Sequence, residues 1–167
     1  MKIVASAKFR LGRIGHGEDG SSIIELAIVF PVLLLLFAGT AELGRLFYTY
    51  STLARATEVG ARYLSVSRDA ASTDPLKVAD AKLAAQSLVV CGFTNCAGKT
   101  PIVAGLSPAT NVKVTPPAAG AIVKYVKVEI QSYNYQPGVF NLAGLTGKAN
   151  SVFYFALTPG TEMRYMP

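Results

Sequence analysis

The chain is predicted to be an α+β protein in which a long N-terminal, membrane-spanning helix continues into a small outer domain. We expect that domain to hold a second helix and an antiparallel sheet of three or four strands. Residues 23–41 are almost continuously apolar, as in a membrane span. Residues 43–64 carry apolar side chains at spacings of three and four, as in an amphipathic helix, and residues 121–132 largely alternate between apolar and polar side chains, as in a half-buried strand.

The first twenty residues predict a flexible, cytoplasmic leader. They contain glycines at 12, 15, 17 and 20 and no sustained periodicity. Their four basic residues outnumber their two acidic ones, which favours a cytoplasmic N-terminus by the positive-inside rule. A disordered basic tail would give the same topology.

The apolar run is long enough to cross a bilayer. Its nineteen positions cover about 28 Å as a helix, close to the thickness of the hydrocarbon core. Glu25 stands only three residues into the run, where a carboxylate costs less than the roughly 2.5–3.5 kcal/mol expected at the bilayer centre. Two interpretations are open for Glu25: a carboxylate that reaches back to the membrane edge, or a functional charge that pairs with a cation.

Four other residues shape the expected helix. Pro31 removes one backbone hydrogen bond and predicts a mild kink. Gly39 and Gly44 would let neighbouring helices approach closely. Glu42 marks the outer end of the span, where we expect it to be interfacial, with a contact to another subunit as the alternative.

The helix is predicted to continue past the membrane as one element over residues 21–66, about 70 Å long. Beyond the span one face is largely apolar, and we expect this stripe to pack under the sheet, with a partner surface as the alternative. The residues of the stripe are Leu43, Leu46, Phe47, Tyr50, Leu53, Thr57, Ala61 and Leu64.

A second helix is predicted over residues 75–90. Asp74 has the chemistry of an N-cap, Pro75 suits the first helical position, and Cys91-Gly92 marks the end. We expect its core face to consist of Leu76, Ala79, Leu83 and Val90.

The two cysteines, Cys91 and Cys96, enclose four residues. With a cytoplasmic N-terminus they lie on the oxidising side of the membrane, where a disulfide closing so short a loop contributes roughly 2 kcal/mol. Two free thiols are the alternative. No further thiol and no imidazole follows the span, so we expect no metal site.

The last third of the chain predicts the sheet. Apolar side chains share one face of residues 121–132 and polar ones the other, with Lys124 departing from the pattern. The exposed-looking loop Phe140–Leu145 fits a buried loop, a membrane-surface contact or a subunit contact. The remaining expected elements are a loop at 97–110, a strand at 111–115, a turn at 116–120, a loop at 138–147 and a strand at 151–157.

Composition and motifs argue against catalysis and nucleic-acid binding. The net charge is +6 and the isoelectric point about 9.4, but the basic residues are scattered rather than clustered. The single histidine, His16, lies in the leader, and no nucleotide-binding or metalloprotease motif occurs. We therefore expect no catalytic residues, no cofactor and no enzyme activity.

Several motifs together resemble a known family. Residues 20–25 read Gly-Ser-Ser-Ile-Ile-Glu and are followed by a leucine run that Pro31 interrupts. Glu42-Leu-Gly-Arg45 and Gly60-Ala-Arg-Tyr63 come after it. This order resembles the TadE-like pseudopilins of the tight-adherence (Tad/Flp) pilus system, closely over residues 20–64 and more loosely over 121–165. Leu26 stands where the family more often has phenylalanine, and Glu18-Asp19 where it more often has basic residues.

The resemblance implies a structural role and a bacterial inner-membrane location. A prepilin peptidase would cleave after Gly20, and the new amine of Ser21 would pair with Glu25 of a neighbouring subunit. Pro31, Gly39, Glu42 and Gly44 would take part in helix packing. The implied partners are other pilin or pseudopilin subunits, the peptidase, the inner-membrane assembly platform and membrane lipid, in a pilus that serves adhesion.

This interpretation divides the chain into a leader (1–20), a transmembrane helix (21–42), its continuation outside the membrane (43–66) and a small pilin-like periplasmic domain (67–167). Alternatives are a secreted binding domain with an ordinary signal peptide, cut at Gly39-Thr40-Ala41, or an unprocessed single-pass anchor. Cleavage at Ala41 would interrupt a helical pattern that continues through it.

Overall fold

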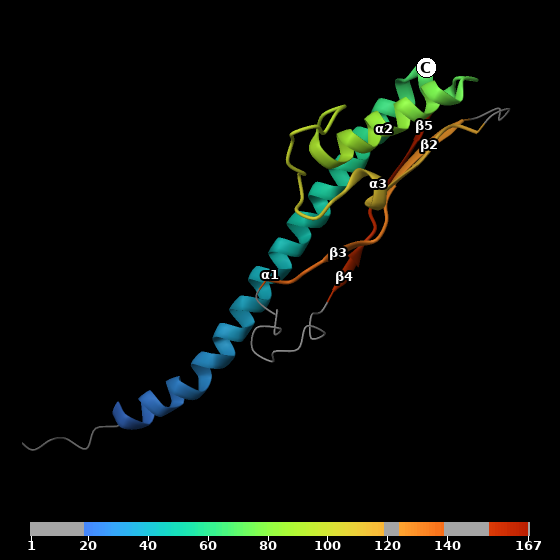
Figure 1. The fold of residues 1–167 in the computed structure, drawn as a ribbon. Helices are drawn as coiled ribbons and strands as arrows, with labels where there is room; N and C mark the ends of the chain where they lie inside the picture. Colours follow the sequence, from blue (N-terminus) through green and yellow to red (C-terminus); the bar gives the residue numbers. More distant parts are fainter. Residues whose placement is uncertain (1–18, 119–123, 139–153, 167) are drawn as a thin grey trace, which may run out of the picture. The chain divides into compact units, whose positions relative to one another are not determined.

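A computed structural model describes residues 19–118, 124–138 and 154–166 (Figure 1). The chain consists of two compact units that meet between Ala38 and Gly39. The expected leader, except for its last two residues, and the Phe140–Leu145 loop lie outside the described residues, as do parts of the expected 116–120 turn and of the strands expected at 121–132 and 151–157.

The first element, α1, is a single helix of 48 residues from Asp19 to Val66. It contains Pro31 and runs without interruption through the boundary at Ala38, which confirms the prediction of one continuous helix. By length and composition it is the one helix among the described residues that could cross a membrane, with a mean hydropathy of 2.4 over its most apolar window.

A short 3-10 helix, η1 (Arg68–Ala71), leads into α2 (Pro75–Cys91). The Asp74 carboxylate caps α2 by accepting a hydrogen bond from the Leu76 amide at 3.0 Å, and Pro75 takes the first helical position. Gly92 ends the helix in a left-handed conformation with φ of 77°, as glycine allows. Both ends of α2 confirm the predicted signals.

The predicted core face of α2 is confirmed at Val90 and wrong at its other three residues. The helix buries Val90 as predicted, but together with Ala81, Ala85 and Val89, whereas Leu76, Ala79 and Leu83 are exposed. The reason is the close approach of α1, because a Cβ atom on Gly60 would lie only 2.6 Å from Val89 Cγ2 and 3.4 Å from the Ala85 carbonyl oxygen. A helix that packs so tightly has room for alanines at the contact and not for leucines.

The strands form two antiparallel sheets. In the larger sheet the order is β1-β2-β5, and in the smaller one β3 pairs with β4. A short helix, α3 (Pro108–Asn111), precedes the first strand. The strands are β1 (Val112–Thr115), β2 (Tyr125–Ile130), β3 (Tyr133–Tyr135), β4 (Phe155–Leu157) and β5 (Gly160–Arg164).

The sheet differs from the sequence expectation at its far edge. The strand expected at 151–157 supplies β4, which pairs with the unpredicted β3 instead of joining the larger sheet. The third strand of the larger sheet is β5, which the sequence analysis missed. Its Gly-Thr-Glu-Met-Arg sequence has little apolar character, and backbone pairing to β2 makes it a strand.

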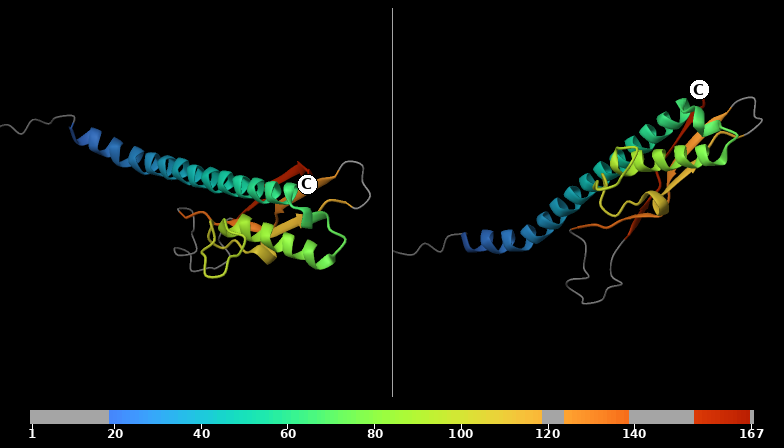
Figure 2. Two further views of the ribbon diagram at one scale, coloured as in Figure 1. Left: turned by 90° about the horizontal axis from the view of Figure 1, so that it is seen from above. Right: turned by 45° about the horizontal axis from the view of Figure 1, so that its top comes forward.

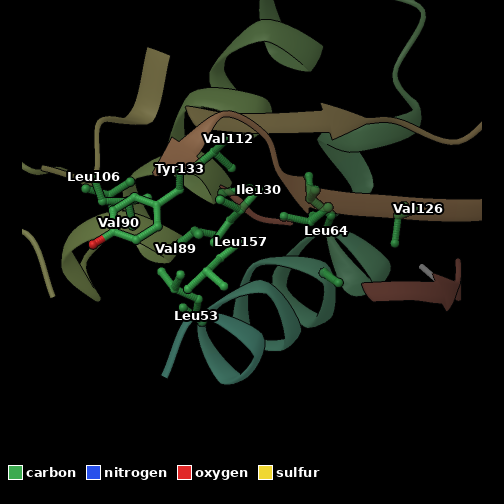
Figure 3. Packing of buried hydrophobic residues seen from close by; sticks show 14 of the residues in the cluster. Leu53, Leu64, Val89, Val90, Leu106, Val112, Val126, Ile130, Tyr133 and Leu157 are labelled. Atoms are coloured by element: carbon green, nitrogen blue, oxygen red, sulfur yellow. The ribbon is translucent and has the colours of Figure 1, made fainter. Parts of the chain in front are cut away.

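One core joins α1, α2 and the sheets within the unit of residues 39–167. Figure 2 shows α2 and β2 beside the outer part of α1, and Figure 3 shows Leu53, Val89 and Leu157 gathered in the core. The β2 residues Val126, Val128 and Ile130 are fully buried, as predicted. The α1 stripe is buried at Leu53, Thr57, Ala61 and Leu64, but Leu43, Phe47 and Tyr50 are exposed, contrary to prediction.

Candidate assembly site: the apolar helix and the Glu42 cluster

The first part of α1 presents a largely apolar surface that is exposed in the part of the chain that the structure describes. Every residue from 21 to 37 is exposed, including the large side chains of Ile24, Leu36 and Phe37. Glu25 and Pro31 are exposed within this segment. Exposure of such a surface to water is unfavourable, and contact with lipid or with other helices would remove it from water.

A second feature lies in the other unit, where Glu42 is buried with 6% of its surface exposed. Its Oε1 atom accepts hydrogen bonds from the Tyr135 hydroxyl at 2.6 Å and from the Gly138 amide at 3.0 Å. Its Oε2 atom lies 3.5 Å from Arg45 Nη1. We call these four residues the Glu42 cluster.

Local structure explains how the Glu42 cluster forms. Glu42 precedes Leu46 by four and Leu53 by eleven residues, so it falls on the helical face that packs into the domain. Tyr133 and Tyr135 alternate with an exposed residue in β3 and both point to the buried side of that strand. A Cβ atom on Gly138 would overlap Arg45 Nη1, so a larger residue there would require the arginine side chain to move.

The electrostatics of the Glu42 cluster keep the tyrosine protonated. Burial, together with the hydrogen bond to Glu42 and the proximity of its charge, raises the pKa of Tyr135 to about 12, although Arg45 acts in the opposite sense. At neutral pH the hydroxyl is therefore a donor to the carboxylate. A charge-assisted hydrogen bond of this kind is stronger than one between neutral groups.

The structure adds partners that the sequence did not predict for Glu42. We expected an interfacial residue at the end of a span, and its carboxylate accepts hydrogen bonds inside the folded unit. The two glycines with a predicted packing role differ in their surroundings. A Cβ atom added to Gly44 would meet no other atom within 4 Å, whereas Gly39 is half-buried. Among the described residues, Gly44 is therefore open on the side where a Cβ atom would point.

The predicted cysteine pair is bonded. Cys91 and Cys96 form a disulfide with their Cα atoms 5.9 Å apart. The loop that follows is fastened back onto α2, because the Ile102 amide donates to the Val90 carbonyl at 2.7 Å. The disulfide and this hydrogen bond together hold residues 92–102 against the C-terminal end of α2.

Sequence reasoning missed the partners of Glu42. Tyr135 and Gly138 lie more than ninety residues away along the chain. A weak signal was present, since a glutamate at helical spacing from the partly buried Leu46 and the buried Leu53 requires a polar partner. The alternation of Tyr133 and Tyr135 before a Pro-Gly pair would have been the place to search for it.

Comparison with known proteins finds a similarity to one family, confined to part of α1. Residues 20–62 match the family model described as TadE-like protein. A TadE-like segment indicates a protein associated with the Tad pilus, and it favours a structural role over catalysis. No curated protein and no solved structure matches the chain.

The TadE-like match covers the apolar segment with Glu25 and continues through Glu42 to Gly60 and Arg62. It ends before α2 and the strands begin. Half of the Glu42 cluster, Tyr135 and Gly138, therefore lies outside the TadE-like segment.

Proposed function

We propose that this protein is a pseudopilin or minor pilin that takes part in assembly of a Tad-type pilus. A prepilin peptidase removes residues 1–20, and the protein resides in the bacterial inner membrane with its C-terminal domain in the periplasm. The observation that carries the proposal is a continuous 48-residue helix whose first part is apolar and exposed and whose last part belongs to a folded core. Residues 21–42 would be stored in lipid and would pack against other such helices in a filament.

Glu25 is the residue that distinguishes this helix from a plain anchor. After cleavage, Ser21 would carry a new amine about 6 Å before Glu25 along the helix axis. No other residue of the run carries a charge, so neither charge would find another ionic partner within it. Pairing the amine of one subunit with the carboxylate of a neighbour would offset the cost of both charges.

The Glu42 cluster has a supporting role in this proposal. Its hydrogen bonds tie the segment after β3 to α1 close to where the folded unit begins at Gly39. Helix packing could therefore change over residues 21–38 while the domain stays folded. Glu42 then acts within its own subunit, and Gly39 and Gly44 serve the approach of neighbouring helices.

The alternative of a secreted domain is less well supported. Signal-peptidase cleavage after Ala41 would cut α1 between turns of one helix. It would also place a new charged amine directly on Glu42, whose carboxylate is buried against Tyr135 and Gly138. The proposed partners are other pilin-like subunits, the prepilin peptidase, the inner-membrane assembly platform and membrane lipid.

N-terminal sequencing and intact mass of the protein from its native membrane test the proposal. The mature chain should begin at Ser21, and it should begin at Met1 in cells without the prepilin peptidase. Gly20→Leu should block maturation, whereas Gly17→Leu is the matched control in the leader and should not. A mature chain beginning at Glu42 would support a secreted domain, and one beginning at Met1 in wild-type cells would support a plain anchor.

A further inference from the structure

The outer face of α2 is an exposed apolar ridge. Leu76 and Leu83 have 73% and 59% of their surface exposed, and Ala79 is exposed between them. Asp80 is exposed on the same side of the helix, because it lies four residues after Leu76 and three before Leu83. We call these four residues the α2 ridge. Two exposed leucines on one helix face, flanked by a carboxylate, present apolar surface that a partner could cover.

A groove of about 430 Å³ lies elsewhere on the same folded unit, between α1 and the C-terminal part of α2. Its walls are apolar at Val59, Leu88 and Ile102. Two of its hydroxyl groups already donate to the Tyr48 carbonyl of their own helix. The lining residues are Tyr48, Ser51, Thr52, Arg55, Ala56, Val59, Leu88 and Ile102, and we call this the α1–α2 groove.

Charge distinguishes the α1–α2 groove from a generic apolar surface. Among the described residues that line the groove, Arg55 is the single charged one and none is acidic. Among the described residues Arg55 has no ion pair within 4.0 Å, and neither has Asp80 on the ridge. The groove therefore presents apolar walls beside a cation. The ridge presents Leu76 and Leu83 beside the anion of Asp80, and the exposed Lys77 lies next to the ridge, three residues before Asp80.

We propose that the α1–α2 groove binds the α2 ridge of a second copy of this chain, with Arg55 of one copy facing Asp80 of the other. Leu83 on the ridge and Leu88 in the groove are five residues apart, about 140° around the helix. One chain therefore presents both surfaces on different sides. Such a contact is head-to-tail, so a pair of copies keeps one free groove and one free ridge. Further copies then add in a row, which stays open or closes into a ring.

The contact goes beyond the proposed function because it joins folded domains rather than membrane helices. It requires neither cleavage after Gly20 nor formation of a pilus. It also accounts for the leucines of α2 that fit an amphipathic pattern and yet face away from their own core.

Cross-linking of the full chain in membranes tests the contact, in cells without the prepilin peptidase so that pilus assembly does not enter the result. Val59→Cys in one tagged copy and Leu83→Cys in a second should form a disulfide at least ~10-fold more efficiently than the control pair Glu58→Cys and Leu83→Cys. Glu58 is the neighbour of Val59 but does not line the groove. A chain carrying both Val59→Cys and Leu83→Cys should give a ladder of oligomers.

Charge exchange tests the pairing itself. Arg55→Glu or Asp80→Arg alone should lower the cross-linking by about 10-fold, and the chain carrying both changes should recover most of it. Arg62→Glu, on α1 outside the groove, should leave it unchanged. The proposal is overturned if the Val59→Cys and Leu83→Cys pair cross-links no better than the control pair, or if it captures only a different protein. It is also overturned if the chain carrying both cysteines gives a dimer band without a ladder, or if the double charge variant shows no recovery.

Discussion

Tyr135→Phe removes one hydroxyl from the Glu42 cluster and leaves the ring in place. The Glu42 carboxylate then loses its 2.6 Å donor and keeps the Gly138 amide at 3.0 Å and Arg45 at 3.5 Å. A hydrogen bond to a charged group contributes about 1.5–3 kcal/mol, and no cavity forms because the ring volume is unchanged. At roughly 2–4 °C per kcal/mol, the melting temperature should fall by about 3–12 °C.

The assay is thermal unfolding of the detergent-solubilised full chain, followed by near-ultraviolet circular dichroism. The matched control is Tyr154→Phe, because Tyr154 is exposed and its loss should cost less than about 0.5 kcal/mol. Glu42→Gln provides a second variant that keeps the side-chain shape and removes the charge. If Tyr135→Phe melts within a degree of the Tyr154→Phe control, the Glu42 cluster does not stabilise the domain and the reasoning is refuted.

Four further predictions follow from the same contacts. The pKa of Tyr135 is raised to about 12 from an unfolded value near 10. The stability that the protonated Tyr135 hydroxyl contributes is therefore complete below pH 10 and is lost as the pH rises towards 12. The free energy of unfolding of Tyr135→Phe should depend less steeply on pH than that of the wild type over this window. Glu25→Gln should insert into the membrane normally but fail to form pili at equal protein levels, and normal pili would reduce Glu25 to a residue of the membrane edge. Gly60→Ala should destabilise the domain by about 1–3 kcal/mol, and adding Val89→Ala should recover part of this loss in a double-mutant cycle. Cys91 and Cys96 should resist alkylation until a reductant is added, and labelling without reductant would contradict the disulfide.

Local chemistry determined much of this protein. The apolar run and the stripe after it predict α1, because helix formation and amphipathicity depend on neighbours three and four residues apart. Asp74 and Gly92 mark the ends of α2, because capping involves groups within one turn. The alternation in β2 identifies Val126, Val128 and Ile130 as its buried face, because the period of a strand is two residues.

The predictions that failed concern contacts between distant segments. The sequence of α2 permits either a leucine face or an alanine face towards the core, and the close approach at Gly60 selects the alanines. β5 is a strand because β2 pairs with it, and its own residues give no such signal.

The candidate site divides along the same line. Gly20, Ser21 and Glu25 form a motif within six consecutive residues, so the sequence alone suffices to propose cleavage and charge pairing. Glu42 is visible as a carboxylate at the end of an apolar run, but Tyr135 and Gly138 become its partners only when β3 packs beside α1. A buried carboxylate depends on the hydrogen-bond donors around it for its stability. Tertiary packing brings those donors together, and neither composition nor periodicity predicts which residues they are.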